Sequence, residues 1–290
     1  MGATIISTKL KYDPMMALVF YKNNILEIKN LAKAKCKTGR ENWCSLQAKI
    51  MYDDEKDLDA IPIMQEYCNS NTKDMSQRCT DLTEFYLGLG PIQPKSIDVS
   101  LAEKFAKKCL LPDSAGLCYM NAIKFLYAKN ISTDEAKRIA YPLLKSALSG
   151  KGLNNKGIDR VNFILNCKLE IVIEKPKVAS IGHIASWVRY KNLSNYPLQF
   201  SGELKAVLTN DSTKVFVSQF VGKTLSYSRK LNPGELIREE ATFQVDDNKS
   251  SEYLPFFQIK QFQSTNLVFS DLEAGSLADR FCNFAVKIEN

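Results

Sequence analysis

The chain has 290 residues, of which 45% are hydrophobic and 24% are charged, and its formal net charge is +7. This composition is that of a folded protein, and the scattered lysines without an arginine-rich tract argue against a dedicated nucleic-acid binder. No apolar run reaches the roughly 18 residues that a transmembrane helix needs, so no membrane span is predicted.

The first part of the chain shows the three- and four-residue apolar spacing of amphipathic helices. In the first such segment the apolar positions are Ile25, Ile28, Leu31 and Ala32. Helices are predicted, in chain order, over residues 24–36, 44–52, 59–68, 79–90, 100–110, 118–130 and 133–150.

Six of the eight cysteines lie where one predicted helix ends and the next begins. Zinc sites favour closer cysteine spacing or histidines, and His183 is the only histidine, so we expect no metal and no cofactor. Buried free thiols would account for the number of cysteines but not for their regular placement. Disulfides account for the placement, and the predicted pairs are Cys36–Cys44, Cys68–Cys79, Cys109–Cys118 and, from the two that remain, Cys167–Cys282.

Each short crosslink would stabilise the fold by about 2–3 kcal/mol, and the long one by about 5 kcal/mol. Four disulfides require an oxidising compartment, so we expect an exported, periplasmic protein. The start of the sequence, MGATIISTKL, lacks the pattern of a signal peptide. The leader is therefore expected to be missing from this sequence.

The paired helices repeat. The second cysteines of the three short pairs are 35 and 39 residues apart (Cys44, Cys79, Cys118), a period typical of α-solenoids. Phe85, Gly88, Gly90, Asp98 and Ala102 resemble the pattern of Sel1-like repeats, a family related to tetratricopeptide repeats. Asp57–Ala60 and Asp134–Ala136 resemble weaker copies. The resemblance covers about residues 30–150 and implies a disulfide-linked helical solenoid, a generic helical-repeat array being the alternative.

From about Cys167 the apolar period changes to two, which predicts β-strands. Strands are predicted over residues 167–176, 185–194, 198–210, 213–221, 223–231, 238–247, 255–262, 266–271 and 280–290. This number of short strands indicates a β-sandwich. The stretches WVRYKNLSNYPLQ and LNPGELIREEATFQV resemble bacterial immunoglobulin-like domains. The expected fold is thus α+β: a Sel1-like helical domain over 1–155, a boundary within Ser149–Asp159, and an immunoglobulin-like sandwich over 160–290 stapled by Cys167 and Cys282 in its first and last strands.

No catalytic motif is complete. Gly152 and Gly157 have the spacing of a phosphate-binding loop, but Ile158 and Asp159 stand where Lys and Ser or Thr are required. His183 has Ser180 and Ser186 nearby without a nucleophile elbow, so we interpret it as a surface or packing residue.

A run of carboxylates is the candidate contact site for a partner. It comprises Asp53, Asp54, Glu55, Asp57 and Asp59, and it lacks the glycine and final glutamate of a calcium-binding loop. A solvated turn between repeats is the alternative interpretation. The aromatic residues Tyr253, Phe256, Phe257 and Phe262 are expected in the core of the sandwich, with one or two free to anchor a partner.

Four Asn-x-Ser sequons begin at Asn130, Asn192, Asn210 and Asn248. They would carry glycans in a eukaryotic secreted protein and would be bare in a bacterial periplasm.

The resemblance to Sel1-like proteins implies a binding protein rather than an enzyme. Proteins of this type include immunity proteins that block toxic effector enzymes, lipases and phospholipases among them, delivered by systems such as type VI secretion. The expected partner is therefore another protein. An envelope adaptor or a secreted host-interaction scaffold is the alternative, and a cell-wall-acting enzyme is a third.

Overall fold

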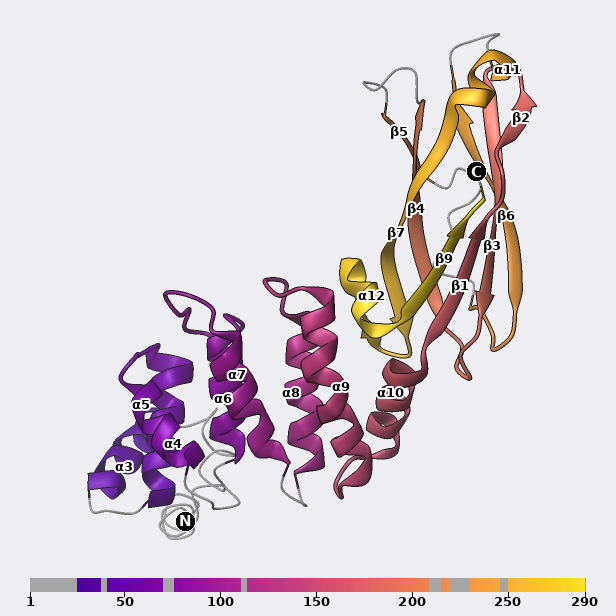
Figure 1. Ribbon diagram of the computed structural model, residues 1–290. Helices are drawn as coiled ribbons and strands as arrows, with labels where there is room; N and C mark the ends of the chain where they lie inside the picture. Colours follow the sequence, from indigo (N-terminus) through magenta and orange to yellow (C-terminus); the bar gives the residue numbers. More distant parts are fainter. Residues whose placement is uncertain are drawn as a thin grey trace, which may run out of the picture. The chain divides into compact units, whose positions relative to one another are not determined.

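The structure is a computed structural model that describes residues 25–37, 41–69, 76–110, 114–208, 215–219, 230–245 and 250–289. These residues form a mixed α+β protein, as predicted (Figure 1). They divide into two compact units. The first comprises the described residues up to Ile131 together with Ile139–Leu153, and the second comprises Ser132–Arg138 together with the described residues from Asn154 on.

The first unit consists of short helices, and each helix from α3 to α7 packs on the next one in the chain. The helices are α3 (Ile25–Lys37), α4 (Glu41–Ile50), α5 (Ala60–Asn69), α6 (Ser76–Tyr86), α7 (Val99–Ala106), α8 (Ala115–Tyr127) and α9 (Thr133–Ser149), the last of which begins in the second unit.

Two kinds of connection alternate along these helices. Disulfides close the short connections and join α3 to α4, α5 to α6, and the turn that follows α7 to α8, through Cys36–Cys44, Cys68–Cys79 and Cys109–Cys118. The connections between these linked pairs carry no disulfide. In the one that leads to α7, the Asp98 carboxylate accepts a hydrogen bond from the Leu101 amide at 2.9 Å and caps the helix.

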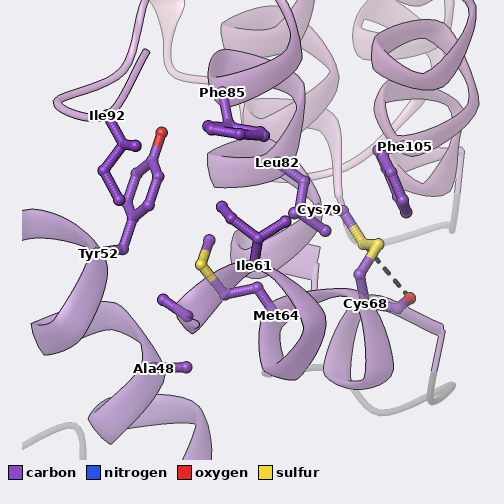
Figure 2. Close-up of a cluster of buried hydrophobic side chains, with 11 residues drawn as sticks. Ala48, Tyr52, Ile61, Met64, Cys68, Cys79, Leu82, Phe85, Ile92 and Phe105 are labelled. Carbon is purple, nitrogen blue, oxygen red and sulfur yellow. Dashed lines mark hydrogen bonds between the residues drawn. A yellow bond between two sulfur atoms is a disulfide. The ribbon is translucent and has the colours of Figure 1, made fainter. Parts of the chain in front are cut away.

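A small side chain follows each linked second cysteine by one helical turn. Ala48, Thr83 and Ala122 each stand four positions after such a cysteine, and each is fully buried. Residues four apart share one face of a helix, so these small side chains allow the neighbouring helix to approach closely. The Thr83 hydroxyl indeed lies 3.5 Å from the carbonyl oxygen of Ala102 in α7. Figure 2 shows the core around the Cys68–Cys79 disulfide.

Gly90 lies against the ring of Tyr52. A β-carbon on Gly90 would stand 1.9 Å from the Tyr52 hydroxyl oxygen. Tyr52 is 1% exposed, and burial, followed by the nearby Glu84 carboxylate, raises the pKa of its hydroxyl. The second glycine of the Gly-x-Gly pattern is thus required by a close approach between the α6–α7 connection and the side chain that follows α4.

The second unit contains two β-sheets and short helices. Its elements after α9 are α10 (Asn155–Asn166), β1 (Lys168–Ile173), β2 (Lys177–Ser180), β3 (His183–Asn192), β4 (Gln199–Leu208), β5 (Val215–Gln219), β6 (Leu236–Gln244), α11 (Ser250–Tyr253), β7 (Phe257–Phe269), β8 (Leu272–Glu273), α12 (Ala278–Phe281) and β9 (Asn283–Ile288).

One sheet has the order β2-β3-β1-β9, with β6 on the other edge of β3, and the second has the order β5-β4-β7-β8. All described pairings are antiparallel except that of β1 with β9. Aromatic side chains from both sheets meet in a shared core. The rings of Tyr190 and Phe200 lie 4.9 Å apart, and those of Phe243 and Phe257 lie 5.0 Å apart.

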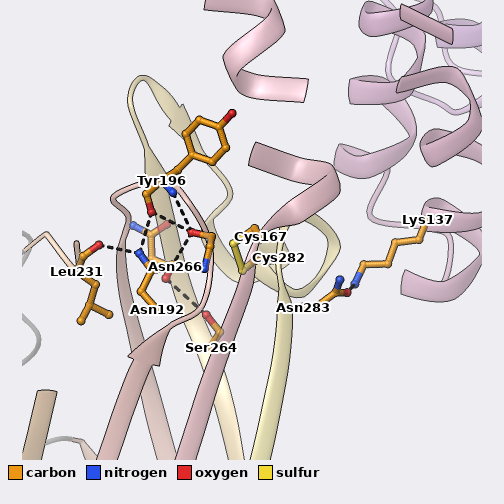
Figure 3. The surroundings of a disulfide bond; sticks show 10 residues. Lys137, Cys167, Asn192, Tyr196, Leu231, Ser264, Asn266, Cys282 and Asn283 are labelled. Atoms are coloured by element: carbon orange, nitrogen blue, oxygen red, sulfur yellow. Dashed lines mark hydrogen bonds between the residues drawn. A yellow bond between two sulfur atoms is a disulfide. The ribbon is translucent and has the colours of Figure 1, made fainter. Parts of the chain in front are cut away.

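The fourth disulfide, Cys167–Cys282, lies where β1 and β9 begin (Figure 3). Each cysteine immediately precedes its strand instead of lying within it, which differs from the sequence expectation. The Asn283 amide donates to the Cys167 carbonyl at 3.0 Å, so the crosslink sets the register of the parallel pair at its first residues. The four disulfides join the same partners as the sequence analysis paired.

Two of these elements differ from the sequence expectations, and a third prediction falls outside the described residues. Helix α10 occupies the second half of the Gly- and Asn-rich segment, because the Asn154 side chain accepts from the Gly157 amide at 2.8 Å and caps it. The strands predicted over 255–262 and 266–271 form one strand, β7. The strand predicted over 223–231 lies almost entirely outside the described residues.

The substitution Gly90→Ala should lower the free energy of unfolding by about 2 kcal/mol, because it forces an added methyl group into the Tyr52 hydroxyl. Adding Tyr52→Phe removes that oxygen and should recover part of the loss. The matched control is Gly116→Ala in α8, where a β-carbon meets nothing within 4 Å. Urea denaturation of the two single variants and the double variant measures this; equal effects at Gly90 and Gly116 would show that the close approach is unimportant.

Replacing Cys167 and Cys282 together by Ala should cost about 5 kcal/mol, because their crosslink closes a loop with a sequence separation of 115. The same change at Cys36 and Cys44, with a separation of 8, should cost about 2.5 kcal/mol. Guanidinium denaturation of both double variants under non-reducing conditions gives the comparison. A larger loss from the short loop would contradict the entropic origin of the effect.

Candidate functional site

The acidic run predicted as a contact site forms the connection between α4 and α5. A π-helical turn, Met51–Glu55, continues α4 and ends at Lys56, whose φ angle of 52° reverses the chain. The Asp57 carboxylate then accepts a hydrogen bond from the Asp59 amide at 2.9 Å, just before α5 begins at Ala60. We call residues 51–59 the acidic connection.

Lysines of neighbouring helices neutralise two of its carboxylates. Lys49 lies 2.7 Å from Asp53, and Lys29 lies 3.4 Å from Glu55. Asp54 and Asp59 are exposed. The negative charge that the connection offers to a partner is therefore concentrated on fewer residues than the sequence suggests.

Leu58 is the residue of this connection that the sequence analysis overlooked. Its side chain is 55% exposed, and it stands between Asp57 and Asp59 in the chain. In the sequence, this leucine lies between two aspartates and outside the apolar spacing of the helices, and that position was the available signal. The connection thus combines an apolar side chain with acidic neighbours.

A buried charge network supports the connection from within the helical unit. Lys49 also lies 3.2 Å from Asp81 of α6, and Asp81 pairs with Arg78 at 2.6 Å. Arg78 and Asp81 are each 4% exposed, and the Arg78 Nε donates to the Ser45 hydroxyl at 3.0 Å. Burial lowers the pKa of the Arg78 guanidinium below its ordinary value, and the adjacent Asp81 carboxylate opposes part of this shift. Because a buried charge without its partner is costly, this network holds α4 in place beside α6.

The Nδ1 atom of His183 does not act as a general base for the neighbouring Ser180. Its Nδ1 lies 3.2 Å from the Ser180 hydroxyl and 3.0 Å from the Ile181 carbonyl oxygen. A carbonyl oxygen only accepts, so the contact with Ile181 requires a proton on Nδ1, and that nitrogen cannot then accept the serine proton. Ser186 is fully buried and donates to the Glu174 carbonyl at 2.5 Å. The contacts of His183 stabilise the turn between β2 and β3, whereas Ser186 ties β3 to the connection between β1 and β2.

The glycines considered for a phosphate loop have structural roles. Gly152 has a φ angle of 102°, which favours glycine, and the Gly157 amide donates to the capping side chain of Asn154. Among the described residues, no group of three or more His, Cys, Asp or Glu is placed to hold a metal ion. None of the helices in the described part of the chain combines the length and apolar character of a membrane span.

Two of the four sequons can be placed. Asn130 is exposed, whereas Asn192 is fully buried; Asn210 and Asn248 lie outside the described residues. The Asn192 amide group donates to the carbonyls of Tyr196 and Leu231 at 2.8 and 2.9 Å (Figure 3). Its oxygen accepts from the amide and hydroxyl of Ser194 at 2.9 and 2.7 Å. This asparagine is a structural corner of the second unit and is closed to glycosylation in the folded protein.

The aromatic residues predicted for the core separate into different environments. Phe257 is buried, Phe256 is 39% exposed, and Tyr253 and Phe262 are half-buried. Phe262 lines a cavity of ≈ 340 Å³ in the second unit, together with Phe284 and Val286 of β9. Nothing in the sequence indicates this cavity, because a strand period of two assigns all three side chains to the core.

The substitution Asn192→Asp should destabilise the second unit by about 3 kcal/mol, because it replaces an amide donor by a carboxylate oxygen facing two carbonyl oxygens. The control Asn130→Asp, at an exposed position, should stay within about 0.5 kcal/mol of the parent protein. Thermal unfolding of both variants at neutral pH measures the difference. A mild effect at Asn192 would mean that the corner tolerates a charge.

Comparison with known proteins adds little. No protein-family model matches the sequence, and no curated protein matches it significantly. Among solved structures, a similar chain is the Pseudomonas fluorescens alkylpurine DNA glycosylase AlkC bound to DNA containing an abasic site analog. The identity is 11%, the TM-score is 0.30, and the match covers 81% of this chain and 70% of that chain. A likeness at this TM-score carries no argument about the function of the protein.

Proposed function

We propose that this chain is an exported protein-binding module whose acidic connection contacts a basic surface of another protein. The observation that carries the proposal is Leu58, which is 55% exposed next to the carboxylates of Asp57 and Asp59. An exposed apolar side chain with polar groups around it has the arrangement of an apolar interface centre with a polar rim. The carboxylates would orient the partner and speed its association.

Rigidity of the helical unit supports the same proposal. Disulfides link the helices on both sides of the connection, Cys36–Cys44 before it and Cys68–Cys79 after it. The network from Lys49 through Asp81 to Arg78 fixes the helix from which the connection emerges. A surface that is ordered before binding loses less conformational entropy when the partner arrives.

The helical unit, in this proposal, is a Sel1-like repeat array. The alternation of linked and unlinked connections supports it, as does the recurring small residue after each second cysteine. Two residues of the repeat pattern also have structural reasons in this chain, Gly90 for its approach to Tyr52 and Asp98 for its cap on α7.

The second unit is proposed to be an immunoglobulin-like sandwich. If β1 and β2 are counted as one interrupted first strand, the second and fifth strands pair as β3 with β6, and the third and sixth as β4 with β7. Those two pairings are central to the immunoglobulin sandwich. The fourth strand, β5, pairs instead with β4, and β9 pairs with β1, so the edges depart from the constant-domain arrangement.

The biological role that fits these features is that of a periplasmic immunity protein. Four disulfides suit an oxidising compartment such as the periplasm. The module would bind a toxic effector enzyme of the lipase or phospholipase class and cover its active-site entrance. An envelope adaptor or host-interaction scaffold would use the same surface without a cognate enzyme.

Charge reversal with loss of the anchor tests the proposal. The triple variant Asp54→Lys, Leu58→Ala, Asp59→Lys should bind the effector encoded beside this chain's gene at least about tenfold more weakly than the parent protein. Glu66→Lys, an exposed acid on α5 outside the connection, is the matched control and should leave the affinity unchanged. Isothermal titration gives both affinities, and an enzyme assay on the mixture reports inhibition.

The outcomes separate the alternatives. Tight binding with full effector activity would favour the adaptor role over immunity. Equal affinity of the triple variant and the parent protein would remove the acidic connection from the interface, and the absence of any complex at micromolar concentration would count against a cognate effector.

A further inference from the structure

The core of the second unit is open along one flank, between β7 and β9. Strand β9 pairs with β1 on one edge, and no described strand pairs with its other edge. Strand β7 pairs with β4 along its length, whereas its other edge pairs, among the described strands, only with β8, at Val268 and Phe269. Two strand edges therefore face the cavity of ≈ 340 Å³, and no strand of the described part of the chain lies between them.

On this flank, side chains of β9 that point toward the core are partly exposed. Val286 stands opposite Ile171 in the β1–β9 ladder, and such partners point to the same face of a sheet. Ile171 is fully buried, yet Val286 is 41% exposed. Phe284, opposite the fully buried Leu169, is likewise only half-buried. The core-facing side chains of β9 are therefore less buried than the core-facing side chains of β1 beside them.

The regular part of the open β7 edge is short. The register of β7 against β4 shifts at two places, which leaves Lys260 and Thr265 as the extra residues of two bulges. Bulges interrupt the pairing of a strand. The regular segment between them, Gln261–Ser264, is also the part of β7 that lines the cavity.

The ends of the cavity differ in chemistry. Ser276 and Asp279 line it from the turn before α12 and from α12 itself, which lies beside β7 and β9 in Figure 1. Asp279 is the one charged residue among those that line the cavity, and its carboxylate accepts from the Thr133 hydroxyl at 2.8 Å. The cavity thus combines three apolar side chains, Phe262, Phe284 and Val286, with a largely polar lining. Its one carboxylate, Asp279, already interacts with the Lys137 ammonium group.

We propose that this flank is an acceptor site for one extended segment of a partner protein. The segment pairs through its backbone with Gln261–Ser264, and its regular pairing is about four residues, or about 13 Å, long. One apolar side chain enters the cavity between Phe262, Phe284 and Val286.

An extended peptide is the occupant because the flank presents strand edges as well as apolar side chains. Backbone donors and acceptors along an open edge are matched by another strand, as in β-augmentation. The two bulges restrict the pairing to a short segment and oppose open-ended association with long strands. The site uses no residue of the acidic connection, so the proposal stands independently of the function proposed above.

The probe is a seven-residue peptide that alternates Val and Thr and ends in Lys, added to the full chain. It should bind the parent protein, and Val286→Lys should weaken the binding by about tenfold because it removes the apolar contact and adds a like charge. The matched control is Ala285→Lys. Ala285 is an exposed neighbour on β9 that faces the opposite side of the sheet, so this variant should bind as the parent does.

A second peptide with alternate amides N-methylated tests the backbone pairing. It keeps the side chains but loses strand-edge donors, and it should bind about tenfold more weakly. Hydrogen exchange of the Gln261–Ser264 amides should slow with the first peptide and not with the second. Equal binding of the two peptides, or no binding at millimolar concentration, overturns the proposal.

Sedimentation of the parent protein distinguishes a second copy of the chain as the occupant. Dimerisation that Val286→Lys abolishes and Ala285→Lys does not would assign the flank to self-association and overturn the partner-segment proposal. Circular dichroism and melting temperatures of both variants confirm that each is folded; Val286 is sufficiently exposed for a lysine to reach solvent.

Discussion

Covalent closure of short helix connections is the constraint on which the helical unit depends. Its helices α3–α8 have between 8 and 13 residues, a length at which an isolated helix is marginal in water. A disulfide across a connection removes conformations from the unfolded chain and brings two such helices together. The small residue one turn after the second cysteine then lets a neighbouring helix pack closely. Crosslink and packing therefore act on the same helix face.

The charged residues of the helical unit belong to two classes that look alike in the sequence. Asp81 and Arg78 are buried and paired, and removing either would leave an uncompensated charge in the core. Asp54 and Asp59 are exposed and free to face a partner. Lys49 connects the classes, since it contacts both Asp81 and Asp53. The surface proposed for binding is thus coupled mechanically to the core beneath it.

The second unit closes one flank covalently and leaves another open. Cys167–Cys282 and the parallel pairing that follows it bind the last strand to the first. Because β9 is held against β1 in this way, it does not pair with β7, and the core-facing side chains of β9 are left partly exposed. The same crosslink that stabilises the unit therefore creates the edge that we propose as an acceptor for a partner's strand.

The sequence alone determined the α+β class, the change from helices to strands and the partners of the three short disulfides, because periodicity and the placement of close cysteine pairs are local properties of the chain. The fourth pair followed from the two cysteines that remained. The sequence also placed the carboxylates of the acidic connection together, since they are contiguous. Only the tertiary structure decided which of them are neutralised, because Lys29 comes from another helix. Likewise, the strand period assigns Val286 to the core, and the Asn-x-Ser motif marks Asn192 as a sequon. Val286 is nevertheless exposed and Asn192 is buried, because their exposure depends on neighbours that are distant in the chain.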